Sequence, residues 1–178
     1  MAYLVEFEGK APRVAEGVFL APTAVLIGDV VVEEGASIWF GAVLRADFGR
    51  IVVGRGTSVQ DNVVIHPDGE CIIGPNVTIG HLALLEGCVV EEQAVIGVGA
   101  VVLERARVGR RAIVAAGSVV TNGMEVPAET LVAGAPAQVK KALSGNARWW
   151  VENAAREYQE LRLRYLQGAR VLPSIGPS

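Results

Sequence analysis

The chain has 178 residues, a net charge of −3 and 51% hydrophobic residues, enough for one domain with a substantial core and a short appendage. Its interspersed charges argue against a nucleic-acid-binding surface, and no apolar run reaches the roughly 18 residues that span a membrane. The N-terminus lacks signal-peptide features, and two cysteines are too few for a disulfide framework, so we expect a cytoplasmic protein without nucleic-acid or membrane partners.

Aliphatic residues recur every six positions through most of the chain, with a one-residue slip after Leu85. A helix would need spacings of three and four, and a half-buried strand would alternate in twos. A six-residue spacing rich in Val and Ile predicts short strands separated by turns, as in a parallel β-helix. We therefore expect an all-β domain over residues 1–138, with six to seven turns over residues 12–138. The recurring residues are Leu20, Leu26, Val32, Ile38, Leu44, Val53, Val59, Ile65, Ile73, Ile79, Leu85, Val90, Ile96, Val102, Val108, Val114, Val120, Val126 and Val132.

Residues 139–178 depart from the repeat and predict a linker, one helix and a tail. The segment "NARWWVENAAREYQELRLRYLQG" reads as a helix, with Asn146 as a candidate cap and Gly168 at its end. We expect the coil of the β-helix to be a prism and the "WW" pair at 149–150 to anchor the C-terminal helix on it. The tail at 169–178 is expected to be irregular. One helical stripe is expected to pack on the prism, formed by Trp150, Ala154, Tyr158, Leu161 and Tyr165.

Folding the repeat brings polar residues from distant positions together. Residues about 18 apart stack at strand spacing once two short loops, near "DFGR" and "HPDGEC", are removed from the count. Leu44, Ile65 and Leu85 then lie on one face in consecutive turns. The residues that follow them form a predicted polar column of Arg45, His66 and Glu86.

The second histidine falls on a different face of the prism. Asp61 and His81 each stand two residues beyond a core position of the preceding face, with Gln60 beside them. By this register His66 and Glu86 can share a metal directly, whereas His81 reaches it more easily from a neighbouring subunit. Three-fold packing would create three identical sites, each with two ligands from one chain and one from the next.

Several longer motifs extend this interpretation. The segments "SIWFGAVLRAD" (37–47), "SVQDNVVIH" (58–66), "VTIGHLALLEGC" (77–88), "AAGSVV" and "VAGAPAQ" together resemble the γ-class carbonic anhydrases and their close relatives over nearly the whole chain. The resemblance implies a left-handed β-helix and a homotrimer. It further implies reversible hydration of CO₂ to bicarbonate by a hydroxide held on zinc, or alternatively iron, at the subunit interfaces.

The same resemblance implies roles for individual residues. His66 and His81 fall on two metal-ligand positions, and Glu86 on the third, where the family usually has histidine. A set of two histidines and one carboxylate is known for zinc and suits ferrous iron, although the carboxylate charge should make bound water less acidic. The polar residues of catalysis and orientation fall on Arg45, Asp47, Gln60, Asp61 and Tyr158.

Each of these residues also has an ordinary structural interpretation. Arg45 and Asp61 suit interface ion pairs, Gln60 suits a turn and Tyr158 suits helix packing. Cys88 suits a small core position. Glu86 could be a lost ligand, in which case no metal is bound.

Three hypotheses for function therefore stand. The first is the metalloenzyme described above, weakened by Glu86. The second is a catalytically inactive binding or scaffold trimer. The third is a hexapeptide-repeat acyltransferase or thioesterase, although no inserted loop here is long enough to cover the pantetheine arm of an acyl-CoA.

Overall fold

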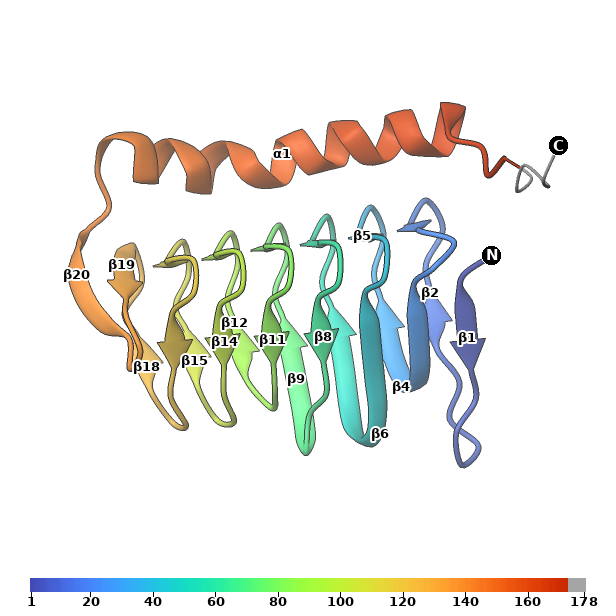
Figure 1. The fold of residues 1–178 in the computed structure, drawn as a ribbon, viewed down its shortest axis with the longest axis horizontal. Helices are drawn as coiled ribbons and strands as arrows, with labels where there is room; N and C mark the ends of the chain where they lie inside the picture. Colours follow the sequence, from blue (N-terminus) through green and yellow to red (C-terminus); the bar gives the residue numbers. More distant parts are fainter. Residues whose placement is uncertain (173–178) are drawn as a thin grey trace, which may run out of the picture.

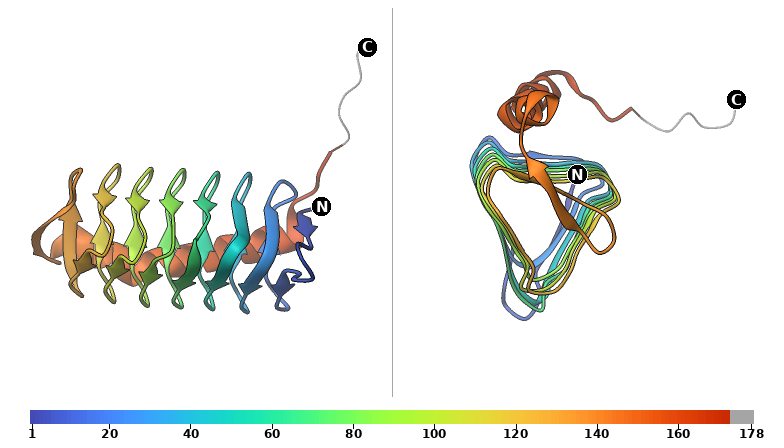
Figure 2. Two further views of the ribbon diagram at one scale, coloured as in Figure 1. Left: turned by 90° about the horizontal axis from the view of Figure 1, so that it is seen from below. Right: turned by 90° about the vertical axis from the view of Figure 1, so that its left-hand side faces the viewer.

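A computed structural model describes residues 1–172 as a coil of short parallel strands followed by one long helix (Figure 1). Viewed along its axis, the coil is a triangular prism with three flat faces (Figure 2). It winds left-handed through about seven turns, which confirms the predicted β-helix with a C-terminal helix.

The first face lies beside the helix, and we call it the helix face. Its outward side chains include Phe19, Ser37, Ser58 and Thr78, which are nearly buried. Its strands are β3 (Phe19–Leu20), β5 (Ser37–Ile38), β7 (Ser58–Val59), β10 (Thr78–Ile79), β13 (Val95–Ile96), β16 (Ile113–Val114), β19 (Thr130–Ala133) and β20 (Gln138–Ala142).

The other two faces form one continuous sheet, because β4 (Val25–Val32) and β6 (Val43–Val53) bend around the edge between them. The second face, which we call the aliphatic face, comprises β1 (Tyr3–Val5), the first halves of β4 and β6, β8 (Val64–Ile65), β11 (Leu84–Leu85), β14 (Val101–Val102) and β17 (Val119–Val120). The third face comprises β2 (Arg13–Val14), the second halves of β4 and β6, β9 (Gly69–Ile73), β12 (Val89–Val90), β15 (Arg107–Val108) and β18 (Glu125–Val126).

Both ends of the coil have strands that the six-residue spacing does not reveal. β1 precedes the first expected repeat and pairs in parallel with β4, while β20 returns antiparallel to β19. Tyr3, Leu4 and Val5 are exposed, as are all residues of β20. The terminal strands therefore lack the alternating burial that makes the internal repeats visible in the sequence.

The helix α1 (Gly145–Gly168) runs back along the helix face toward the N-terminal end of the coil (Figure 1). It ends at Gly168 as expected, but its N-cap is Ser144, not Asn146, and Ser144 makes no side-chain cap hydrogen bond. Of the expected tail, residues 169–172 have no regular structure and residues 173–178 lie outside the described part of the chain. Within residues 1–172, no helix combines the length and apolar character needed to cross a bilayer.

The helix is held to the prism by small and aromatic side chains. Val151 and Ala154 are buried, while the expected stripe residues Tyr158, Leu161 and Tyr165 pack on a buried cluster of Phe19, Ala21 and Trp39. The predicted anchoring by the tryptophan pair is wrong. Trp149 and Trp150 are each about half exposed and stack edge-to-face on one another at 5.3 Å, whereas Val151 and Ala154 are buried.

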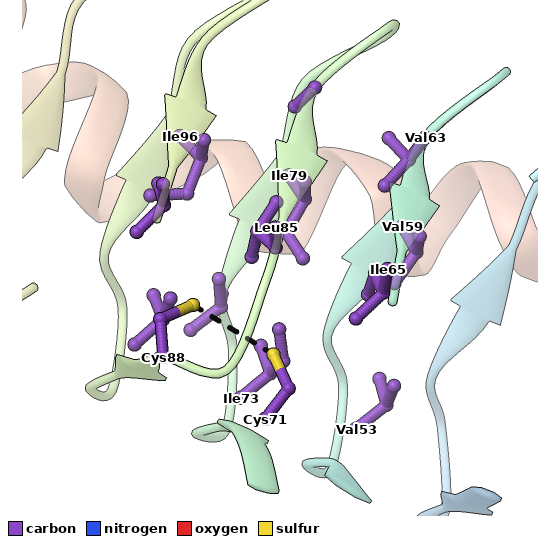
Figure 3. Close-up of a cluster of buried hydrophobic side chains, with 14 of the residues drawn as sticks. Val53, Val59, Val63, Ile65, Cys71, Ile73, Ile79, Leu85, Cys88 and Ile96 are labelled. Atoms are coloured by element: carbon purple, nitrogen blue, oxygen red, sulfur yellow. Dashed lines mark hydrogen bonds between the residues drawn. The ribbon is translucent and has the colours of Figure 1, made fainter. Parts of the chain in front are cut away.

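Aliphatic side chains from all three faces fill the prism (Figure 3). Cys71 and Cys88 belong to this core, with their sulfurs 3.8 Å apart in neighbouring turns and no disulfide between them. Proximity to the Cys71 thiol, together with burial, raises the pKa of the Cys88 thiol well above its ordinary value. The Cys88 thiol therefore stays protonated, and both cysteines serve as small core residues.

Ile72 and Ile73 offer a direct test of the inward and outward positions. Ile73 points into the prism and is 1% exposed, whereas its neighbour Ile72 points outward and is half-buried. Ile73→Ala is expected to lower the free energy of unfolding by about 2–5 kcal/mol, since it leaves a core cavity. Ile72→Ala should lower it by clearly less in the same urea titration, and equal losses would contradict the assigned register.

Candidate functional site

The polar residues singled out in the sequence lie on two opposite edges of the aliphatic face. Leu44, Ile65 and Leu85 pair in consecutive turns, so the predicted column of Arg45, His66 and Glu86 is confirmed as a backbone register. We call this the first edge; it separates the aliphatic face from the third face. The second edge, between the helix face and the aliphatic face, carries Gln60, Asp61 and His81, whose strands pair in the expected register.

On the first edge Arg45, Asp47 and His66 form a connected cluster. Asp47 Oδ2 accepts a hydrogen bond from the Arg45 guanidinium at 2.5 Å, and Asp47 Oδ1 lies 2.9 Å from His66 Nε2. Arg45 Nη2 lies 3.3 Å from His66 Nδ1, which fits a neutral imidazole with its proton on Nε2. Burial alone would raise the pKa of the Asp47 carboxyl, but hydrogen bonds from His66 and Arg45 and the charge of Arg45 outweigh it and lower that pKa. Asp47 is therefore an anionic anchor that orients both neighbours.

Glu86 stands one turn further along the first edge. Its side chain is half-buried, and within residues 1–172 no side chain donates a hydrogen bond to its carboxylate or forms an ion pair with it. The exposed ring of Phe48 lies beside the imidazole of His66, with ring centroids 5.7 Å apart. Phe48 lies in the part of β6 that adds residues to the repeat, so the six-residue spacing gives no signal for it.

On the second edge Asp61 fixes the orientation of His81. Asp61 Oδ2 lies 2.8 Å from His81 Nδ1, and its Oδ1 accepts the backbone N–H of Phe40 at 3.1 Å. Gln60 is 4% exposed, and its Oε1 accepts the backbone N–H of His81 at 3.2 Å. His81 Nε2 has no hydrogen-bond partner among residues 1–172, so this nitrogen is available to a ligand.

The orientation of His81 matches a general feature of metal-binding histidines. Such histidines commonly give one ring N–H to a carboxylate, which fixes the tautomer and directs the other nitrogen to the metal. Asp61 supplies this carboxylate for His81, and Asp47 supplies one for His66. The His66 ring contacts Asp47 through Nε2 at 2.9 Å and Arg45 through Nδ1 at 3.3 Å. The contact with Arg45 is the longer of the two, so a metal cation could take the place of the Arg45 cation at Nδ1. With the carboxylate of Glu86, the donor set suits zinc or ferrous iron.

One chain does not bring the three expected ligands together. Within residues 1–172 no group of three histidine, cysteine, aspartate or glutamate side chains is close enough to hold a metal ion. His66 and Glu86 occupy the first edge and His81 the second, with the width of the aliphatic face between them. A three-ligand site built from these residues therefore requires a second subunit.

Between the two edges, the outward side chains of the aliphatic face are uniformly apolar. They stack in register from turn to turn and are half-buried or exposed in the single chain. A continuous apolar row of this kind on the surface of a folded domain indicates an interaction surface. The row consists of Val25, Val43, Val64, Leu84, Val101 and Val119.

Tyr158 projects from α1 toward the second edge. Its ring packs edge-to-face on Trp39 at 5.7 Å, so the helix-packing interpretation describes at least part of its role. Burial, followed by the negative charges of Asp61 and Glu157, raises the pKa of its phenol. The indole N–H of Trp39 is in turn shared by the hydroxyls of Ser37 and Ser58, at 3.0 and 2.9 Å.

A left-handed prism of six-residue repeats, with polar residues on the two edges of an apolar face, is the architecture of a hexapeptide-repeat protein. A family model described as "Bacterial transferase hexapeptide (six repeats)" matches residues 87–122. The chain is 39% identical over 164 residues to "Carnitine operon protein CaiE" of Salmonella agona, covering 91% of this chain and 83% of that protein. The chain thus belongs to the γ-carbonic-anhydrase-like family of hexapeptide-repeat proteins.

Two further relatives define the breadth of this family. "Gamma carbonic anhydrase 2, mitochondrial" of Arabidopsis thaliana is 40% identical over 160 residues, which cover 85% of this chain but only 58% of the plant protein. The crystal structure of a hexapeptide transferase family protein from Anaplasma phagocytophilum superposes with a TM-score of 0.89 at 38% identity, covering 92% of this chain and 98% of that chain. Family membership is therefore established, whereas the named activities of these relatives differ.

Proposed function

We propose that this protein is a homotrimeric metalloprotein that reversibly hydrates CO₂ to bicarbonate. The metal, Zn²⁺ or alternatively Fe²⁺, would be held by His66 and Glu86 of one subunit and His81 of the next. The single observation that carries the proposal is the division of these residues between the two edges of one apolar face. Three-fold packing along that face would join unlike edges and create three equivalent sites.

The proposed assembly is supported by the aliphatic row and by the family. Burying Val64, Leu84 and their neighbours against another subunit would remove apolar surface from water. Relatives named γ-carbonic anhydrases share about two-fifths of their aligned residues with this chain. The free thiols of Cys71 and Cys88 fit a reducing compartment such as the cytoplasm.

The residues around the ligands have separable tasks in this proposal. When bound, zinc or iron lowers the pKa of a coordinated water toward ~7 and so supplies a nucleophile for CO₂. Asp61 holds His81 in one tautomer, and Asp47 does the same for His66. Arg45 would stay hydrogen-bonded to Asp47 once a metal displaced it from His66 Nδ1, and its charge there can attract bicarbonate. Gln60 holds the backbone of His81, which leaves its amide NH₂ group to donate to the reacting oxygen atoms.

The proposal predicts about one metal ion per chain and CO₂ hydration that depends on it. Protein prepared anaerobically and loaded with Zn²⁺ or Fe²⁺ is expected to hydrate CO₂ in a stopped-flow assay faster than buffer does. The matched control is Asp61→Asn, which keeps the size of the side chain but frees the tautomer of His81 and should weaken metal binding about 10–100-fold. Stoichiometric metal without any catalysed rate would contradict the enzymatic part of the proposal.

Two other functions make different predictions in the same experiments. A binding or scaffold trimer should hold no stoichiometric metal, and a chelator should leave its assembly unchanged. An acyltransferase or thioesterase should turn over acyl-CoA and lose that activity in His81→Ala. The Anaplasma structure is described as a hexapeptide transferase family protein, so an acyl-CoA screen belongs beside the CO₂ assay.

A further inference from the structure

A slot lies between α1 and the prism, and Gln60, His81 and Tyr158 form part of its wall. The slot has a volume of about 320 Å³. This volume is at the lower end of the range for small-molecule sites. It is about ten times the volume that one molecule occupies in liquid water. It is therefore much larger than CO₂ or bicarbonate requires.

The slot has a floor from the sheet and a roof from the helix. Thr78 and Val95, which are paired neighbours on β10 and β13, face outward from the prism and form the floor. Residues of α1 spaced by three and four positions form the roof, since this spacing places them on one helical face. These roof residues are Trp150, Ala154, Glu157 and Tyr158.

One buried polar atom in the slot lacks a partner. Thr78 is 5% exposed, and its hydroxyl makes no hydrogen bond within residues 1–172. Thr78 alternates with the inward-facing Ile79, so its side chain points away from the core and toward α1. A buried hydroxyl without a partner is unfavourable, and rotation of the Thr78 side chain about χ1 would turn it into the slot, where a ligand hydroxyl would satisfy it.

The charges around the slot favour a cation. Glu157 lines the roof, and Asp61 is near enough for its charge to raise the pKa of Tyr158. Among the described residues that line the slot there is no lysine or arginine, and His81 is already paired with Asp61. Trp150 and Tyr158 add aromatic rings, whose faces attract ammonium groups.

We infer that the slot between α1 and strands β10 and β13 binds a small organic cation, an amine or quaternary ammonium compound that carries a hydroxyl group. The ammonium group lies against Glu157 and the rings of Trp150 and Tyr158, and the ligand hydroxyl pairs with Thr78. The inference rests on the slot alone and requires no metal at His81.

Three probes of nearly the same shape separate the contribution of charge. Choline is the cation, 3,3-dimethylbutan-1-ol replaces its nitrogen with carbon, and 3,3-dimethylbutanoate carries a negative charge. Calorimetric titration of the full-length protein is expected to show choline binding about 3–30-fold more tightly than the neutral alcohol, with the carboxylate weakest. The titrations use chelator-treated protein, because a metal on His81, which lines the slot, would repel the cation; a failure of the proposed metal site therefore leaves this result unchanged.

Variants of adjacent residues locate the binding. Trp150→Leu and Glu157→Gln should each weaken choline binding several-fold. Trp149→Leu and Glu160→Gln should not, because neither side chain lines the slot although both are comparably exposed on α1. Circular dichroism would verify that each variant is folded. Equal binding of choline and the alcohol, tighter binding of the carboxylate, equal effects of the two tryptophan variants, or no saturable binding would overturn the inference.

Discussion

Glu86→His is expected to increase the rate of CO₂ hydration per bound metal by about tenfold or more. Replacing a carboxylate with a neutral imidazole removes a negative charge beside the metal, which should make coordinated water more acidic. A shift of one pKa unit corresponds to about 1.4 kcal/mol, or a factor of ten in an equilibrium. The measurement is stopped-flow CO₂ hydration normalised to metal content, with Zn²⁺ and Fe²⁺ tested separately.

The control for this prediction is Glu86→Gln, which keeps the shape of the side chain but removes its charge. It should lower metal content, since an amide is a poorer ligand for zinc than a carboxylate. If the wild type binds no metal whereas Glu86→His binds zinc tightly and hydrates CO₂, Glu86 marks a lost site and the scaffold interpretation is preferred. If Glu86→His and Glu86→Gln both leave metal content and rate unchanged, Glu86 is not a ligand.

The second large effect is recovery of metal sites by mixing two defective variants. His66→Ala and His81→Ala should each bind almost no metal alone. In trimers co-assembled from equal amounts of both, a site is intact where a His81→Ala chain supplies His66 and Glu86 and the next chain supplies His81. Random assembly makes about a quarter of the interfaces intact. Every trimer that contains both variants has one intact interface of three, so trimers purified through two different affinity tags should hold about a third of the wild-type metal content.

The matched control combines His66→Ala with Glu86→Ala. Both substitutions lie on the first edge, so no interface of the mixed trimer contains the full set of ligands and no recovery is expected. Recovery in this control, or its absence in the first mixture although mixed trimers form, would contradict a site shared between subunits. An assembly state other than a trimer, measured by light scattering, would also rule out the proposed arrangement.

Much of the fold could be predicted because the signal is local and repeated. Each turn of the coil buries one aliphatic residue per strand, so a six-residue spacing in the sequence is sufficient to identify the core positions. The same count placed Leu44, Ile65 and Leu85 in register and correctly aligned the residues that follow them. The terminal strands β1 and β20 could not be found in this way, since their side chains are exposed.

The helix was predicted less completely than the coil. Its approximate extent and the contacts of Tyr158 and Tyr165 follow from helical spacing, but the start at Gly145 and the half-exposed positions of the tryptophan pair do not. Those features depend on the direction in which α1 leaves β20 and on which residues then face the sheet. Hydrophobicity alone does not separate Trp150 from its buried neighbour Val151.

The sequence by itself determined the repeat, the register and the identity of the candidate ligands, because each turn of the prism uses a nearly constant number of residues. Only the tertiary structure decided how Asp47 and Asp61 hold the two histidines, since the rotamers of side chains on neighbouring turns depend on their three-dimensional contacts. It also decided that a slot remains between α1 and the strands bearing Thr78 and Val95, because the slot is the space left after two elements far apart in the chain pack together.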